Sequence, residues 1–243
     1  MRYISWSSSR SESLFTSPKK LPIKNMFGNF FKIYIPGIVS LLFSLQSAAS
    51  FDSKSCLSPN IIERAQWGAR SPASLNYLVT PLLYAVIHHT VTPECNRFSE
   101  CADIVRSIQN HHMNDLGWDD IGYSFMVGGD GNVYEGTGWS TEGAHTLGYN
   151  RKSIGIAFIG NFQQSYRNSS LEITVAKDAK EKSLQAAHDL IICGKNLGYL
   201  RSNVKVIGAR QVSATESPGN KLYAHIQSWP EWSVVPRREN IFP

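Results

Sequence analysis

The adjacent histidines His88 and His89 are the residues of this 243-residue sequence best suited to chemistry, and they follow the apolar run 82–87. Neighbouring side chains on a β-strand point to opposite faces, so these two imidazoles cannot hold one metal ion together. A catalytic zinc ion needs three protein ligands and an open fourth position. His112 and His145 are further candidate ligands, but neither lies at a recognised spacing from His88. The pattern leaves two alternatives open: one histidine facing a groove at the carboxyl end of a strand, or two structural histidines.

No motif for a reactive serine or a bound phosphate accompanies these histidines. The sequence has no G-x-S-x-G, the turn that presents the nucleophile of α/β-hydrolases. Its glycine-rich stretch VGGDG (127–131) does not open a helix, so it indicates a hairpin turn and not a phosphate loop. Tyrosines and tryptophans could stack on sugar rings, although aromatic residues in strands more often belong to the core.

The elements that must position these residues alternate along the chain. Short runs rich in β-branched and aromatic residues predict strands at 82–88, 123–127, 154–159 and 204–207, with 133–135 as the return arm of a hairpin. Apolar residues at helical spacing predict helices at 99–114, with Ser99 as N-cap, and at 179–197 and 220–229. Strands alternating with helices predict an α/β domain with a mixed sheet.

Residues 1–50 have the composition of a leader. A basic, serine-rich flank precedes the apolar run 33–45 and a group of small residues at 47–50, the order typical of a secretory signal peptide. Read from Met26 the segment has an ordinary signal length, so translation could start there. A signal-anchor helix is the less favoured alternative, because 33–49 is at the lower limit for spanning a bilayer and contains Pro36 and Gly37. We therefore expect a secreted, extracellular protein.

The net charge of +5 belongs to this leader. Residues 1–50 hold six basic residues and one acidic residue, which leaves 18 of each among residues 51–243. A neutral domain gives no electrostatic reason to bind nucleic acid.

All four cysteines follow the leader, and an even number in an exported chain favours two disulfides. Cys95 and Cys101 enclose five residues, so a local pair is expected, which leaves Cys56 with Cys193. A zinc site is the competing interpretation, but no C-x-x-C pair supports it. A polar insertion at 163–177 carries the glycosylation sequon at Asn168, and we expect a loose tail over 236–243.

A series of motifs runs through residues 55–233 in one order: RAQWG (64–68), VIHHTVTPEC (86–95), SIQNHHMND (107–115), GWDDIGYSFMVGGDGNVYEGTGW (117–139), GAHTLGYN (143–150), SIGIAFIGNF (153–162), SPG (217–219) and LYAHIQSWP (222–230). In this respect the chain resembles the peptidoglycan recognition proteins. The resemblance implies a central mixed β-sheet flanked by three helices, the fold of type 2 N-acetylmuramoyl-L-alanine amidases, over residues 51–235.

The resemblance also implies where catalytic members would hold zinc, with a His-His-Cys ligand set and a tyrosine beside the metal. His88 matches the first ligand and Tyr123 the tyrosine, but Ala209 and Ser217 stand where the second histidine and the cysteine belong. Alanine has no donor atom, and a neutral hydroxyl is a poor zinc ligand compared with a thiolate. We therefore expect no zinc cofactor and no catalysis, with His88 and Tyr123 as vestiges of the catalytic site.

By the same resemblance, eight residues would contact a muramyl peptide: Thr90, His112, Gly117, Trp118, Tyr123, Thr137, His145 and Asn150. Two markers of peptide type disagree. In the family, the Gly-Trp pair at 117–118 is associated with diaminopimelate stems, but such members commonly carry an arginine where this chain has Thr137. A charge pair needs its cation, so the missing guanidinium favours lysine-type peptidoglycan.

The resulting hypothesis is a secreted innate-immune receptor that binds bacterial peptidoglycan without cutting it. By resemblance it would defend against Gram-positive bacteria through the Toll pathway, with downstream recognition or serine protease cascade proteins as partners. The alternatives are a peptidoglycan hydrolase, an amidase or peptidase with an atypical site around His88, Tyr123 and Ser217, and a membrane-anchored receptor.

Overall fold

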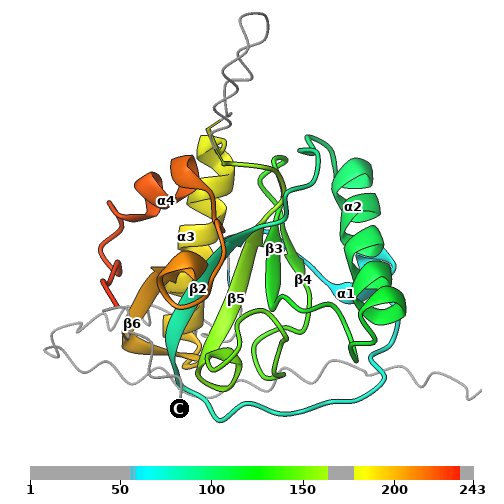
Figure 1. The fold of residues 1–243 in the computed structure, drawn as a ribbon, viewed down its shortest axis with the longest axis horizontal. Coiled ribbons are helices and arrows are strands. Elements are labelled where there is room, and N and C mark those ends of the chain that lie inside the picture. Colours follow the sequence, from blue (N-terminus) through cyan, green and yellow to red (C-terminus); the bar gives the residue numbers. More distant parts are fainter. Residues whose placement is uncertain (1–55, 57, 164–177, 236–243) are drawn as a thin grey trace, which may run out of the picture. The chain divides into compact units, whose positions relative to one another are not determined.

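A six-stranded mixed sheet forms the centre of the protein (Figure 1). The structure, a computed structural model, describes residues 56, 58–163 and 178–235. The strand order is β1-β4-β3-β5-β2-β6, and only the β3–β4 hairpin is antiparallel. The strands are β1 (Ile61–Ile62), β2 (Leu82–His89), β3 (Phe125–Val127), β4 (Val133–Glu135), β5 (Ser153–Phe158) and β6 (Leu200–Gly208). The predicted fold class is confirmed.

Three predictions fall on residues outside the described ranges: the leader over 1–50, the sequon at Asn168 and the tail over 236–243. Within the described ranges, no helix is both long enough and apolar enough to cross a membrane.

Helices cover the two faces of the sheet unequally (Figure 1). α3 (Glu181–Asn196) and α4 (Asn220–Ile226) pack on one face, where they share the large core with Ile87, Ile156 and Val206. α2 (Phe98–Asn110) packs on the other face against Met126 and Tyr134, so it covers the β3–β4 half of the sheet. The four-residue α1 (Arg64–Trp67) lies beside α2 and adds Trp67 to the same cluster.

The central strands follow the apolar pattern, whereas the shorter elements differ from the prediction. β6 begins at Leu200 rather than at 204, because an edge strand can hold the exposed residues 201–203. β1 and α1 were not predicted, since two and four residues are too few to show a period. The N-cap prediction at Ser99 was wrong: α2 begins one residue earlier, after Arg97, and no side chain caps it.

The helix predicted over 99–114 is in fact two elements. α2 ends at Asn110, and residues His111–Asp115 form a π-helical turn in which the Leu116 amide donates to the His111 carbonyl at 3.2 Å. The apolar pattern does not distinguish a π turn from an α turn. Single π turns are often found at functional sites.

Both predicted disulfides are present. Cys95–Cys101 links residues six positions apart, and both cysteines are buried in the cluster beneath α2. Cys56–Cys193 joins the start of the described chain to α3 across 137 positions.

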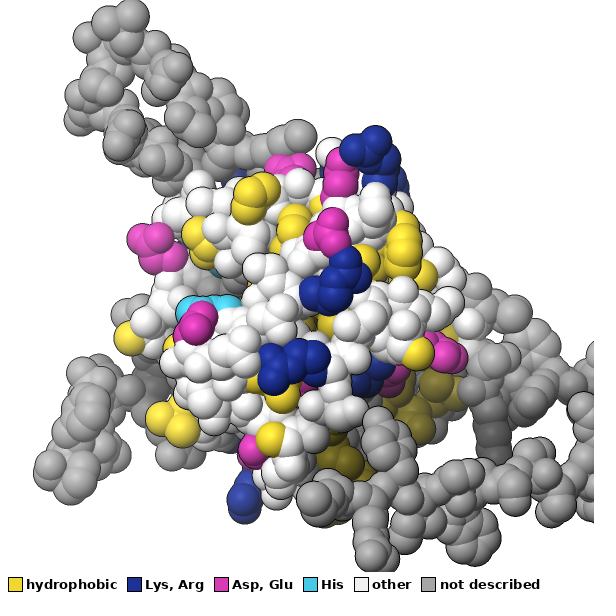
Figure 2. Space-filling model, turned by 90° about the vertical axis from the view of Figure 1, so that its right-hand side faces the viewer, with side chains coloured by type: hydrophobic (Ala, Val, Ile, Leu, Met, Phe, Trp, Pro, Cys, Tyr) yellow, Lys and Arg dark blue, Asp and Glu magenta, His cyan; other side chains and the backbone are white. Residues whose placement is uncertain are grey.

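The exposed face on the α2 side carries basic and acidic side chains interspersed (Figure 2). No large area of one sign is visible there. On this face the charges give no continuous footprint for a polyanion.

Candidate functional site

His88 and His89 end β2, a central strand, and their side chains lie on opposite faces of the sheet. His89 packs toward the large core, where its Nδ1 accepts a hydrogen bond from the Phe162 amide at 3.2 Å. His88 points to the opposite face, on the half of it that α2 does not cover, where Val86 and Ala209 also lie. Of the two alternatives for this pair, the structure supports one histidine directed to the site and one directed to the core.

Aromatic and imidazole rings form a continuous group around His88. The Tyr123 ring lies 5.4 Å from it and the His145 ring 5.5 Å, centroid to centroid. The His112 ring is 5.8 Å from Tyr123 and 4.7 Å from Trp118. Five residues from four separate motifs of the sequence, His88, His112, Trp118, Tyr123 and His145, therefore meet in one place, which we call the ring cluster.

The π turn and Gly117 position the His112 side of the ring cluster. His112 is buried within the π turn, and its Nδ1 accepts a hydrogen bond from the Gly122 amide at 2.9 Å. The proton of its neutral ring must therefore sit on Nε2. Gly117 has a φ of 69°, a left-handed conformation that glycine adopts without strain, and the chain then returns so that the Trp118 amide donates to the His112 carbonyl.

Thr146, which was not predicted as a site residue, orders the other side of the cluster. Its Oγ1 lies 3.1 Å from both His88 Nε2 and His145 Nδ1. A hydroxyl donates one proton, so one of these imidazoles accepts and the other donates. The Asn150 Oδ1 accepts from the Thr146 amide at 2.7 Å and holds this loop in place.

Gly155 on β5 leaves room for the His145 ring. A Cβ at position 155 would lie 2.4 Å from His145 Cγ and 2.8 Å from its Nδ1. Sequence reasoning missed this role, although a glycine inside a strand pattern signals a close approach.

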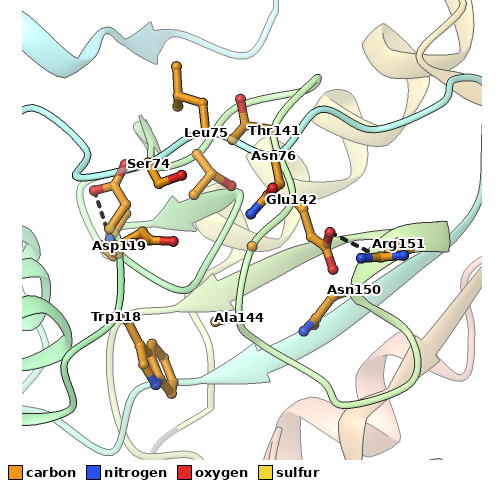
Figure 3. Close-up of a pocket in the computed structure, with 14 residues that line it drawn as sticks. Ser74, Leu75, Asn76, Trp118, Asp119, Thr141, Glu142, Ala144, Asn150 and Arg151 are labelled. Carbon is orange, nitrogen blue, oxygen red and sulfur yellow. Dashed lines mark hydrogen bonds and ion pairs between the residues drawn. The ribbon is translucent and has the colours of Figure 1, made fainter.

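A cavity of about 270 Å³ adjoins the ring cluster (Figure 3). Trp118, Thr137 and Asn150, three of the predicted contact residues, line it, and the Thr137 Oγ1 is buried with no hydrogen-bond partner among the described residues. Gly117 is not among the residues that line the cavity; it is the residue before Trp118 in the chain. Thr90 lies one residue beyond β2, where its hydroxyl bonds to the Gly160 amide and to Thr92 instead of to the cluster.

Burial keeps the imidazoles of the ring cluster neutral at pH 7. It lowers the pKa of His112 and of His145 to about 4. The pKa of His88 is lowered well below its usual value, first by burial and then by the neighbouring His145 and His89. Burial also raises the pKa of the Tyr123 hydroxyl. The ring cluster therefore presents uncharged hydrogen-bonding groups and ring faces, which suit a polar ligand of modest charge, whereas charged side chains are confined to the adjoining cavity.

Acidification should destabilise the fold through these histidines. Between pH 6.5 and about 4 these histidines become protonated in the unfolded chain but stay neutral in the folded protein. The free energy of unfolding therefore falls as pH falls through this window. For His145 alone, the decrease in the free energy of unfolding at pH 4.5 is on the order of 2–3 kcal/mol. Urea unfolding at pH 7 and pH 4.5 measures it, and His145→Gln should show a smaller difference between the two pH values. An equal difference in both proteins would contradict this assignment.

The substitution Gly155→Ala should weaken ligand binding by at least about tenfold, because overpacking at a buried position forces side chains to move. The displaced group is the His145 ring. The control is a double-mutant cycle: in a His145→Ala background the same change should have little further effect on binding. Retention of insoluble cell-wall material measures both, and equal losses in the two backgrounds would show that Gly155 does not act through His145.

The residues at the family's metal position do not fit zinc. Ile87 pairs with Gly208 across β2 and β6, and His88 and Ala209 are the residues that follow this pair, Ala209 just beyond the end of β6. Ala209 offers no donor atom, and the Ser217 hydroxyl accepts a hydrogen bond from the His89 amide at 3.1 Å. In the part of the chain that the structure describes, no group of three His, Cys, Asp or Glu residues could hold a metal ion. A single imidazole cannot supply a three-ligand catalytic site.

Ser217 also lacks the surroundings of a nucleophile. Among the described residues its Oγ has one hydrogen bond, from the backbone amide of His89, and no imidazole or carboxylate is bonded to it as a base. An activated serine needs such a base within hydrogen-bond reach. The geometry thus gives no support to a serine hydrolase.

A mixed central sheet with these helices is the fold of the amidase-like domains. Residues 78–220 match the family model described as N-acetylmuramoyl-L-alanine amidase. The chain is 45% identical over 201 residues to peptidoglycan-recognition protein SA of Drosophila melanogaster, an alignment that covers 82% of this chain and 93% of that protein. The chain belongs to the peptidoglycan-recognition protein family.

Solved structures agree with this assignment. Bumblebee PGRP-SA superposes with a TM-score of 0.68 at 54% identity, covering 74% of this chain and all of that one. The ectodomain complex of PGRP-LCa and PGRP-LCx with bound tracheal cytotoxin gives a TM-score of 0.67 at 43% identity, covering 73% of this chain and 100% of that one.

Proposed function

We propose that this protein is a secreted receptor that binds bacterial peptidoglycan without cleaving it. The observation that carries the proposal is an ordered binding surface beside a broken metal position. The ring cluster lies beside a cavity, and Ala209 and Ser217 stand at the positions where the resemblance places two zinc ligands. A relative with bound tracheal cytotoxin supports the choice of ligand class. The eight predicted contact residues are assigned to this ligand on the same basis.

The leader and the disulfides support secretion. A signal-like segment occupies 1–50, and both disulfides join cysteines of the following domain, 51–235. Structural disulfides persist in oxidising, extracellular surroundings. Removal of residues 1–50 and Toll-type signalling through a serine protease cascade are parts of the same proposal.

Lysine-type peptidoglycan is the proposed ligand. Thr137 lines the cavity with a hydroxyl where an arginine would pair with the extra carboxylate of diaminopimelate. The neutral imidazoles add no cation in the ring cluster, and Arg151, the basic residue that lines the cavity, is paired with Glu142 at 3.3 Å.

A pull-down with insoluble cell walls tests the proposal. The purified secreted protein should be retained by lysine-type walls, more weakly by diaminopimelate-type walls, and should release no muropeptides from either. Retention by neither wall would rule out the receptor function. Muropeptide release that survives chelation and is lost in His88→Ala would instead establish the atypical hydrolase.

A further inference from the structure

The connection between α1 and β2 carries a series of exposed apolar side chains. It runs along the lower edge of the fold in Figure 1, and it has no bend from Ser74 to Val79. Leu75 is 48% exposed, Tyr77 74% and Val79 88%. In an extended chain every second side chain points to the same face, so these three form one line, which we call the apolar row. Leu78, on the opposite face, packs against the large core.

One side of this connection is hydrogen-bonded and the other side is not. The Leu78 amide donates to segment 140–142 at 2.8 Å, and the Asn76 carbonyl accepts from the same segment at 2.7 Å. Tyr77 thereby forms an antiparallel bridge with Thr141. Successive residues of an extended chain direct their amides and carbonyls to opposite sides. Those of the apolar row therefore face outward, and none of them forms a hydrogen bond with a residue that the structure describes.

The connection lacks the charged side chains that usually protect a free strand edge. An unpaired edge is a template for a further strand, and proteins commonly block it with lysine, a bulge or a covering element. Residues 71–81 contain no charged residue. Pro72 and Pro81 cannot donate a main-chain hydrogen bond, so they restrict the free edge to the residues between them.

The apolar row is complementary to a second copy of itself. When two copies meet antiparallel with Tyr77 opposite Tyr77, Leu75 of each copy lies opposite Val79 of the other. Each of these pairs can then exchange both main-chain hydrogen bonds, and every side chain of the row meets an apolar or aromatic neighbour. No like charges meet in this arrangement. A charged peptide of another protein would instead find no counter-charge in residues 71–81.

We propose that residues 74–79 form a dimerisation edge, at which two copies of this chain pair as antiparallel strands around Tyr77. A two-fold axis centred on Tyr77 is the arrangement that pairs all three residues of the row with one another. The paired segment is short, so it buries a small area and the dimer is weak, with an expected Kd of about 10 μM to 1 mM. Leu75 also lines the cavity beside the ring cluster, whereas Tyr77 does not, so Tyr77 is the residue to vary.

Exchange of charges at position 77 tests this pairing. Sedimentation of the purified secreted protein at increasing concentration should show a monomer–dimer equilibrium. Tyr77→Lys and Tyr77→Glu should each raise the dimer Kd at least about tenfold, because like charges then lie directly opposite one another. A mixture of the two variants should associate more tightly than either variant alone, since the opposed charges then attract. Association that returns on mixing also shows that both variants are folded.

Val234→Lys is the matched control, because it introduces the same charge at a side chain that is 75% exposed and lies outside the connection. It should leave the dimer Kd unchanged. A native protein that stays monomeric up to about 1 mM would overturn the proposal, and so would a Tyr77→Lys variant that dimerises as tightly as the native protein. If the mixture associates no better than each variant alone, Tyr77 does not lie opposite itself and the proposed pairing is wrong.

Discussion

The double substitution Ala209→His with Ser217→Cys is expected to give this domain a zinc site that the native chain cannot form. With His88 it would complete a two-histidine, one-cysteine ligand set with an open fourth position. β2 and β6 already bring positions 88 and 209 to the ends of adjacent strands, and the Ser217 hydroxyl lies at the end of β2 beside the His89 amide. Metal analysis after dialysis against zinc should find about one zinc per chain in the double variant.

The single variants separate a designed site from adventitious binding. Each single variant lacks one ligand, so its affinity for zinc should be lower than that of the double variant. The decrease should exceed the about 10–100-fold that loss of an outer-sphere partner alone causes. Adding His88→Ala to the double variant should abolish the gain. Zinc retained by that triple variant would show that position 88 is not part of the ligand set.

The sequence predicted the central sheet well because its strands carry a strong local signal. β5 is buried along its whole length and β2 from Ala85 to His89, and both are mostly apolar runs, the pattern of strands covered on both faces. The two-residue β1 and the four-residue α1 gave no such signal, because their place depends on tertiary pairing. The π turn at His111–Asp115 was missed for another reason: the apolar spacing of α2 continues through it, and only the hydrogen bonds change.

The site was predictable where a side chain has distinctive chemistry. His88, Tyr123 and His145 could be named from their motifs, and the structure brings them together. Thr146 and Gly155 could not, because one acts as a hydroxyl between two imidazoles and the other acts through the absence of a Cβ. Residues that position others leave a weaker trace in the sequence than the residues they position.

Because the imidazoles of the ring cluster are neutral, they do not need a metal ion to contact a ligand. Buried imidazoles with pKa values near 4 donate or accept hydrogen bonds at pH 7 without carrying charge. Such groups can hold a glycan–peptide whether or not a metal is bound beside them. Under the proposed function, Ala209 and Ser217 would therefore remove the means of cutting without disturbing the order of the ring cluster.

Removal of the Cys56–Cys193 disulfide is expected to produce the largest loss of stability of any change considered for this domain. The bond closes a loop of 137 positions, and it ties the start of the described chain to the buried side of α3. In the chain-entropy treatment, opening so long a loop lowers the free energy of unfolding by about 4–5 kcal/mol. Urea unfolding of the paired variant Cys56→Ser with Cys193→Ser, compared with the native protein, measures the change.

The second disulfide provides the control, because it differs mainly in loop length. Cys95–Cys101 spans six positions, so its removal should cost only about 2–3 kcal/mol through chain entropy. Both its cysteines are buried, however, and serine at these positions would add a polar penalty, so alanine is the appropriate replacement there. If loop entropy governs, the long-range variant loses more stability than the local one and its peptidoglycan binding at low temperature survives, since the ring cluster contains neither Cys56 nor Cys193. A larger loss from the local pair would show that packing under α2, and not loop closure, dominates the contribution of these bonds.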